Sequence, residues 1–207
     1  MDYVFIHGSG QKSTSWNETI SNMVNIKNIL CPELYSLLNG KDATYDNLYS
    51  AFVEYCNNIS EPLNLCGLSL GGILALNYVT DYPEKVKTLV LICTAYKIQS
   101  ILFNIQLIVF RFLPKSVFNK SGFQKRDMLK LANSMKKLDF SHNLKNINCS
   151  TLIICGANDK GNLKSAKYLS ENIKNAKLKI IKNTGHVINE ENPKILAYEL
   201  EEYYNGN

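Results

Sequence analysis

The sequence lacks the features that mark membrane-spanning, exported and disordered chains. Its 207 residues include no clean apolar run of about 18 residues, so we expect no membrane-spanning helix. The first eight residues have no basic segment and no small-residue cleavage site, so we expect no export signal. Because 45% of the residues are hydrophobic, the composition excludes a disordered tail and indicates one ordinary globular domain.

Arginine is scarce. Only Arg111 and Arg126 are arginines among the 23 basic residues, although the net charge is +5. Nucleic-acid-binding surfaces are typically built from arginine clusters with interleaved aromatic residues, so we expect no nucleic-acid partner. The charge is also uneven, because residues 96–149 hold ten basic and two acidic residues. This segment could steer anionic substrates or contact acidic lipid, or it could be a solvated lysine-rich face.

Paired metal-binding and redox motifs are also missing. None of the six cysteines forms a C-x-x-C pair, and His7, His142 and His186 have no zinc-like spacing with cysteine. Three of the cysteines lie inside apolar runs, as is typical of reduced core cysteines in the cytoplasm. We therefore predict no metal, no other cofactor and a cytoplasmic location.

Short apolar runs alternate with longer amphipathic stretches along most of the chain. Most runs are continuously apolar, as in strands buried on both faces of a parallel sheet. The last helix should begin with Asn192 as its N-cap and Pro193 at its first position. This alternation predicts a three-layer α/β sandwich with right-handed crossovers. The expected strands are Tyr3–Ile6, Ile29–Cys31, Leu63–Cys66, Thr88–Ile92, Thr151–Cys155 and Leu178–Ile181.

One interval interrupts the alternation. More than 50 residues separate the strand ending at Ile92 from the strand starting at Thr151. A structureless loop of that length is implausible in a compact domain, so we expect helices there. We interpret residues 96–149 as an inserted helical cap, and residues 1–95 and 150–207 as one core domain.

The strongest local signal is Gly67-Leu68-Ser69-Leu70-Gly71-Gly72, which directly follows an apolar run and opens a helical stretch. This is G-x-S-x-G in the strand–turn–helix context that a nucleophilic serine requires. The turn would expose Ser69 Oγ and place the Leu70 N–H at a helix N-terminus, where it favours a developing oxyanion. The alternative is a structural glycine-rich turn whose serine only caps the helix.

A nucleophilic serine needs a base and an acid to orient that base. His186 follows the last predicted strand and is our candidate for the base, with a plain surface histidine as the alternative. His7 is followed by a glycine that suggests another role, and His142 lies in a polar stretch. Asp159 follows the strand Thr151–Cys155 and completes the chain order Ser, Asp, His. Its alternative role is to cap the helix that follows.

The second oxyanion donor should come from the loop after the first strand. His7-Gly8-Ser9-Gly10 is glycine-rich and follows Phe5-Ile6 directly, so a tight turn could aim the Ser9 N–H into the site. The alternative is an ordinary loop between a strand and a helix.

In this order, these segments resemble the α/β-hydrolase superfamily over nearly the whole chain. The resemblance implies Ser69 as nucleophile, Asp159 as acid, His186 as base, and Ser9 and Leu70 as oxyanion donors. It also implies a cap at residues 96–149. The chain departs from the family pattern because no antiparallel hairpin precedes its first strand. We therefore expect a reduced, wholly parallel sheet of about six strands with one uncovered edge, through which the chain could form a homodimer.

The cap begins with an apolar stretch, residues 98–113, that contains Phe103, Leu107 and Phe110. The simpler interpretation is a helix packed over the site. In the more specific interpretation, these three side chains line an acyl pocket for small or medium apolar groups.

We therefore expect a serine hydrolase of the carboxylesterase type acting on a small-molecule acyl substrate, with no stable membrane insertion. A thioesterase, a carbon–carbon bond hydrolase or a lyase could use the same triad. A lipase that binds membranes peripherally and a non-catalytic binding protein on the same fold are further alternatives.

Overall fold

A computed structural model describes residues 2–98 and 124–207. Within these ranges six strands form one sheet in the order β2-β1-β3-β4-β5-β6, and every neighbouring pair is parallel. This confirms the reduced, wholly parallel sheet of about six strands that was expected from the family resemblance and the missing N-terminal hairpin. The strands are β1 (Tyr3–Ile6), β2 (Ile29–Leu30), β3 (Leu63–Leu68), β4 (Val86–Ile92), β5 (Ser150–Gly156) and β6 (Ala176–Ile181).

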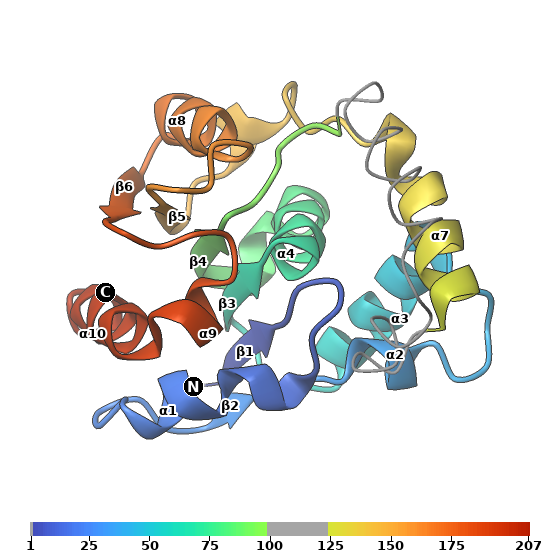
Figure 1. Ribbon diagram of the computed structural model, residues 1–207, viewed down its shortest axis with the longest axis horizontal. Helices are drawn as coiled ribbons and strands as arrows, with labels where there is room; N and C mark the ends of the chain where they lie inside the picture. Colours follow the sequence, from blue (N-terminus) through green and yellow to red (C-terminus); the bar gives the residue numbers. More distant parts are fainter. Residues whose placement is uncertain (1, 99–123) are drawn as a thin grey trace.

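Helices cover both faces of the sheet (Figure 1). Right-handed crossovers that run in the same direction across the sheet place their helices on the same face. Therefore α3, α4 and α8 share one face, while α1, whose crossover runs in the opposite direction, lies with α10 on the other. The longer helices are α3 (Tyr45–Asn57), α4 (Leu70–Asp81), α7 (Lys125–Ser134), α8 (Leu163–Asn172) and α10 (Pro193–Asn205). The short ones are η1 (Ser13–Trp16), α1 (Asn17–Ser21), α2 (Leu34–Leu37), η2 (Pro83–Lys85), η4 (Met135–Lys137), η5 (Leu144–Asn146) and α9 (Ile188–Glu191).

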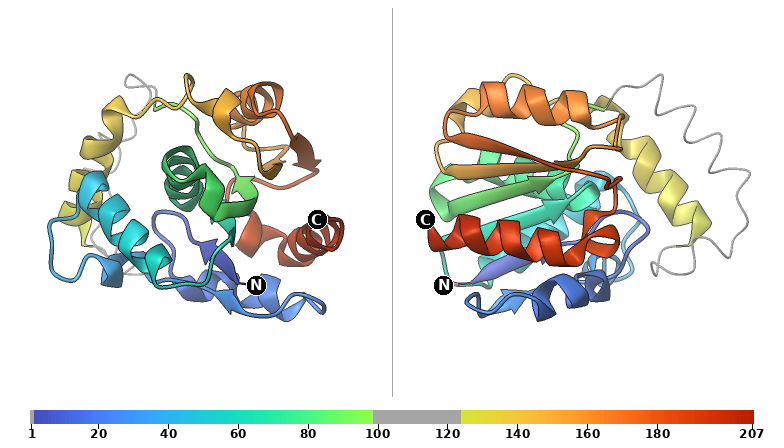
Figure 2. Two further views of the ribbon diagram at one scale, coloured as in Figure 1. Left: turned by 180° about the vertical axis from the view of Figure 1, so that it is seen from behind. Right: turned by 60° about the vertical axis from the view of Figure 1, so that its left-hand side comes forward.

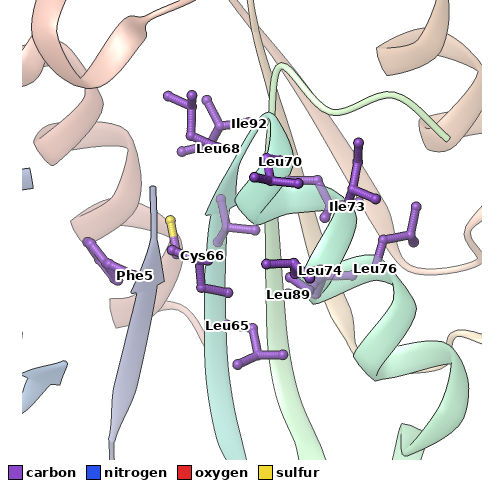
Figure 3. Close-up of a cluster of buried hydrophobic side chains, with 14 of the residues drawn as sticks. Phe5, Leu65, Cys66, Leu68, Leu70, Ile73, Leu74, Leu76, Leu89 and Ile92 are labelled. Atoms are coloured by element: carbon purple, nitrogen blue, oxygen red, sulfur yellow. The ribbon is translucent and has the colours of Figure 1, made fainter. Parts of the chain in front are cut away.

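The core lies between the central strands and α4. All six residues of β3 are buried, and Asn64 is the only polar side chain among them. In Figure 3, Phe5 of β1, Leu65 of β3 and Leu74 of α4 belong to one cluster of buried side chains. Nine of the twelve residues of α4 are buried, so burial rather than amphipathic patterning holds this helix on the sheet.

Several details differ from the sequence interpretation, and the four strands from β3 to β6 are all longer than expected. The second strand ends at Leu30 instead of Cys31. Asn192 occupies the N-cap position of α10, but its side chain makes no capping hydrogen bond. Its Nδ2 instead donates to Thr184 Oγ1 at 3.0 Å, which ties the start of α10 to the turn after β6.

Two described parts of the segment between β4 and β5 lie side by side. Lys97 and Asp139 form an antiparallel bridge, and Lys97 Nζ lies 2.6 Å from Asp139 Oδ2. Further along the segment, Ser134 Oγ at the end of α7 accepts a hydrogen bond from Tyr45 N of α3 at 2.8 Å. The division into a core and an inserted cap stays a prediction. Phe103, Leu107 and Phe110 lie outside the described residues.

The two edges of the sheet differ. The edge strand β2 has only two residues, so it offers little backbone for pairing with a second chain. The other edge strand, β6, carries Lys179, whose Nζ lies 2.8 Å from Glu199 Oε2. A homodimer through an uncovered edge stays a prediction. Within the described ranges no helix is both long enough and apolar enough to cross a membrane.

The close contact between α4 and β1 leads to a stability prediction. A Cβ at Gly71 would lie 2.2 Å from the Ile6 carbonyl oxygen and 2.8 Å from that of His7. Alanine is favoured over glycine in an open helix, but here the methyl group collides with backbone. We therefore expect Gly71→Ala to lower the free energy of unfolding by about 3 kcal/mol in urea titrations.

Gly206→Ala is the matched control, because the nearest atom to its added Cβ, Glu202 O, lies at an ordinary 3.6 Å. This control should shift the unfolding free energy by no more than about 0.5 kcal/mol. Equal effects of the two substitutions would contradict the close contact at Gly71.

Candidate active site

A cavity of about 720 Å³ opens at the carboxyl ends of the strands. Residues from distant parts of the chain line it, because parallel strands all end at the same edge of a sheet. Ser9 comes from the loop after β1, Ser69 and Leu70 from the turn between β3 and α4, and His186 from the loop after β6. The start of α8 and one face of α7 also line the cavity. Figure 2 shows these two helices apart from each other, so they form separate walls.

Ser69 occupies a strained backbone conformation. Its φ of 53° and ψ of −111° fall where a residue with a side chain is rarely found. Its N–H donates to Ile92 O of the neighbouring strand at 2.8 Å, which holds the turn against the sheet. The Ser69 side chain makes no capping hydrogen bond to α4, so it does not serve as the helix cap. The hydroxyl is therefore free to face the cavity.

Asp159 and His186 are brought together from two loops. His186 Nδ1 lies 2.7 Å from Asp159 Oδ2, and the side chain of Asp159 is only 9% exposed. With its Nδ1 proton donated to Asp159, His186 keeps Nε2 as an acceptor; this tautomer follows from the hydrogen bonds. The carboxylate therefore orients the imidazole.

The carboxylate of Asp159 is held ionised by its neighbours. Burial alone would raise its pKa, but hydrogen bonds from His186 and Asn162 outweigh burial and lower the pKa below its ordinary value. Asn162 Nδ2 lies 3.1 Å from Oδ1 and 2.9 Å from Oδ2 of Asp159. Asp159 Oδ1 also accepts from Asn162 N at 3.3 Å, so it closes the turn before α8 as well as pairing with His186.

In the described part of the chain, no hydrogen bond joins the Ser69 hydroxyl to His186. Both side chains line the same cavity, and such contacts are often long before substrate binds. His142 is exposed in a turn and is not among the described residues that line the cavity.

The backbone donors near Ser69 can be accounted for one by one. Gly8 N donates to Gln11 Oε1 at 3.0 Å, and Gln11 N donates back to Gly8 O at 3.3 Å. These two bonds occupy the N–H groups of Gly8 and Gln11. In the described ranges, the N–H groups of Ser9 and of Leu70, at the start of α4, donate to no protein acceptor. Both residues line the cavity. Unpaired N–H groups at a cavity wall are suited to binding a negatively charged oxygen.

Gln11 was missed by the sequence analysis and links two walls of the cavity. Its buried side chain donates from Nε2 to Asn189 Oδ1 at 2.9 Å and to Glu190 Oε1 at 2.8 Å. It therefore connects the loop that carries Ser9 to the helix that follows His186. No local signal could have revealed this, because its partners lie 178 and 179 positions away.

His7 is a buried, neutral histidine beneath the same loop. Its Nδ1 lies 2.9 Å from Gly8 O, and its Nε2 accepts the Leu34 N–H at 3.2 Å. Burial lowers the pKa of His7, despite the hydrogen bond to Gly8 and the nearby Glu33 carboxylate, which raise it. Because Nε2 already accepts a hydrogen bond, we interpret its 3.2 Å contact with Glu33 Oε1 as close packing and not as an ion pair. His7 thus supports the loop and does not face the cavity.

One cluster of potential metal ligands lies behind Asp159. The sulfur atoms of Cys93 and Cys155 and a carboxylate oxygen of Asp159 lie within 4.8 Å of one another. The Cys93 pKa is raised by its hydrogen bond with Cys155 and by burial, and a protonated thiol is a poor metal ligand. The residues present therefore fit a pair of buried, protonated thiols better than a metal centre. Cys93 also has a positive φ of 48° at the end of β4.

We expect Gln11→Met to lower the free energy of unfolding of the protein. Methionine preserves the side-chain length but removes the partners of the Gly8 N–H and of Asn189 Oδ1, and unpaired buried polar groups cost about 1–3 kcal/mol each. Chemical denaturation should show a loss of about 3 kcal/mol. The exposed neighbour in Lys12→Met should change stability by less than about 0.5 kcal/mol, and a similar loss in both variants would show that the Gln11 bonds are not important.

Comparison with known proteins gives one family and one fold. A model described as the alpha/beta hydrolase family matches residues 3–199. A pimeloyl-[acyl-carrier protein] methyl ester esterase from Wigglesworthia glossinidia brevipalpis is 33% identical over 98 residues. That match spans 46% of this chain and 37% of the relative.

Solved structures match over almost the whole chain. MenH from S. aureus superposes with a TM-score of 0.79 at 18% identity, covering 100% of this chain and 94% of that one. The enol-lactonase from Burkholderia xenovorans LB400 gives a TM-score of 0.78 at 13% identity, covering 99% and 91%. At these identities the two structures show a shared fold.

Proposed function

The chain belongs to the alpha/beta hydrolase family, and from this premise we propose that it is a serine hydrolase that cleaves carboxylic esters through an acyl-enzyme on Ser69. The observation that carries the proposal is the 2.7 Å contact between His186 and Asp159 beside a strained Ser69 in one cavity. A serine becomes a nucleophile only where a base can take its proton, and a paired histidine is such a base.

In the proposed mechanism, Ser69 Oγ attacks the carbonyl carbon of the ester while His186 Nε2 takes the hydroxyl proton. Asp159 stabilises the imidazolium that forms. The N–H groups of Leu70 and Ser9 bind the oxyanion of the tetrahedral intermediate. His186 then gives its proton to the leaving alcohol, and water, activated by the same histidine, hydrolyses the acyl-enzyme and restores Ser69.

The apolar side chains of the cavity wall that includes α7 favour a substrate with an apolar acyl group. Met128, Leu131 and Met135 line the cavity together with Ile73 of α4. Flexible and branched apolar side chains of this kind bind small or medium hydrocarbon groups by burying them. The ester class is supported by the name of the relative that is 33% identical over 98 residues, a methyl ester esterase. We also propose that the protein is located in the cytoplasm.

The covalent step can be tested with a fluorophosphonate probe and intact-mass measurement. Wild-type protein should gain one adduct, and Ser69→Ala should gain none, because the nucleophile is missing. Ser165→Ala is the matched control: this serine lines the same cavity, and its loss should not prevent labelling. An adduct that persists in Ser69→Ala would contradict the proposal.

In the same assay Asp159→Asn should slow labelling by about 10³- to 10⁴-fold, because an amide favours the wrong tautomer of His186. Circular dichroism should show that this variant remains folded. Labelling at the wild-type rate would mean that Asp159 does not orient the base.

The oxyanion donors can be tested by a pair of substitutions at Ser9. Ser9→Pro removes the N–H, whereas Ser9→Ala keeps it. We expect Ser9→Pro to lower kcat for a 4-nitrophenyl ester by about 10²- to 10³-fold, and Ser9→Ala to retain most of the activity. Thermal unfolding of both variants provides the check on folding. Equal kcat values in two folded variants would exclude the Ser9 N–H as a donor.

A further inference from the structure

The described lining of the cavity contains basic side chains but no acidic ones. Lys97, Lys160 and Lys164 are among the described residues that line it, whereas no Asp or Glu is among them. Lys97 is neutralised by Asp139, whose carboxylate lies 2.6 Å from the ammonium group. Among the described residues that line the cavity, the other two lysines therefore carry the charge that a ligand would meet.

Lys160 and Lys164 have no acidic partner within 4.0 Å in residues 2–98 and 124–207. The sequence also shows that residues 98–126 contain no Asp or Glu, so this stretch cannot supply a carboxylate to either lysine. Two unpaired cations at the wall of a cavity create a positive potential that favours an anionic ligand.

The position of these lysines assigns them to one part of a substrate. Lys160 directly follows Asp159, and Lys164 lies in the first turn of α8, so both belong to the wall that also holds the partner of His186. The apolar side chains of α7 also line the cavity. In Figure 1, helix α7 lies well apart from α8, so the two helices contribute to different walls. His186 protonates the leaving group, which must therefore lie on the His186 side of the cavity.

We propose that Lys160 and Lys164 bind an anionic group, a carboxylate or a phosphate, on the alcohol or thiol portion of the substrate. The proposal rests on the proposed function and specifies its substrate class. The acyl portion is apolar and faces α7, while the leaving group is negatively charged and lies against the start of α8. The two lysines determine specificity and take no part in the transfer of protons.

The test uses pairs of esters that share a butyryl group and differ only in the charge of the leaving group. One pair is 4-(butyryloxy)benzoate and 4-(butyryloxy)benzamide, and each kcat/KM is divided by that ester's own rate of alkaline hydrolysis. A second pair compares butyryl-coenzyme A with the phosphate-free S-butyryl-N-acetylcysteamine. We expect the anionic member of at least one pair to be preferred by about three- to thirty-fold, which corresponds to two partly exposed ion pairs.

The double variant Lys160→Gln/Lys164→Gln should bring this ratio close to one, and 0.5 M NaCl should lower it in the wild type by screening the charges. Lys167→Gln is the matched control, because Lys167 is an exposed lysine of α8 that is not among the residues lining the cavity. It should leave the ratio unchanged.

Three results would overturn the proposal. The first is a wild-type ratio of one or less in both pairs. The second is a preference that survives the double variant. A third arm uses a 4-nitrophenyl ester with a carboxylate at the far end of the acyl chain; if only this substrate loses activity in the double variant, the assignment to the leaving group is wrong. Hydrolysis of any butyryl ester together with labelling of Ser69 would leave the proposed function intact in each case.

Discussion

The site depends on backbone segments that approach more closely than side chains would allow. Gly156 ends β5, and a Cβ there would lie 2.1 Å from Gly185 O and 2.3 Å from Thr184 O. The turn before His186 can therefore pack directly on the end of the strand that precedes Asp159. The same constraint operates at Gly71, where α4 meets the end of β1. These two contacts place side chains from opposite ends of the chain around one cavity.

Hydrogen bonds then fix the charge and the orientation of each group. Asp159 stays ionised although its side chain is mostly buried, because His186 and Asn162 donate to it. His7 has the opposite role: burial keeps it neutral, so that it can accept the Leu34 N–H and hold the loop before Ser9. Gln11 joins that loop to Asn189, beyond His186. The polar groups around the cavity are thus positioned before any ligand binds, which is the condition for electrostatic stabilisation of a transition state.

Much of the fold was predictable because its signals are local. Buried parallel strands are continuously apolar, and the glycines around Ser69 indicate a sharp turn between a strand and a helix. The juxtaposition of Asp159 and His186 followed from the rule that parallel strands end at one edge. The contacts of Gln11 and Cys93 were not predictable, because their partners are distant in sequence and nothing in their own neighbourhood marks them. Asn162 carried a weak signal, its spacing of three residues from Asp159, which is typical of a turn that precedes a helix.

The most direct test of the account is a crystal structure of the protein after reaction with a fluorophosphonate. The account predicts phosphorus bonded to Ser69 Oγ and the phosphonyl oxygen about 2.7–3.1 Å from the backbone nitrogens of both Leu70 and Ser9. His186 should remain paired with Asp159. A phosphonyl group on another residue, or an oxygen directed away from both amides, would contradict the central claim that these segments form one hydrolytic site.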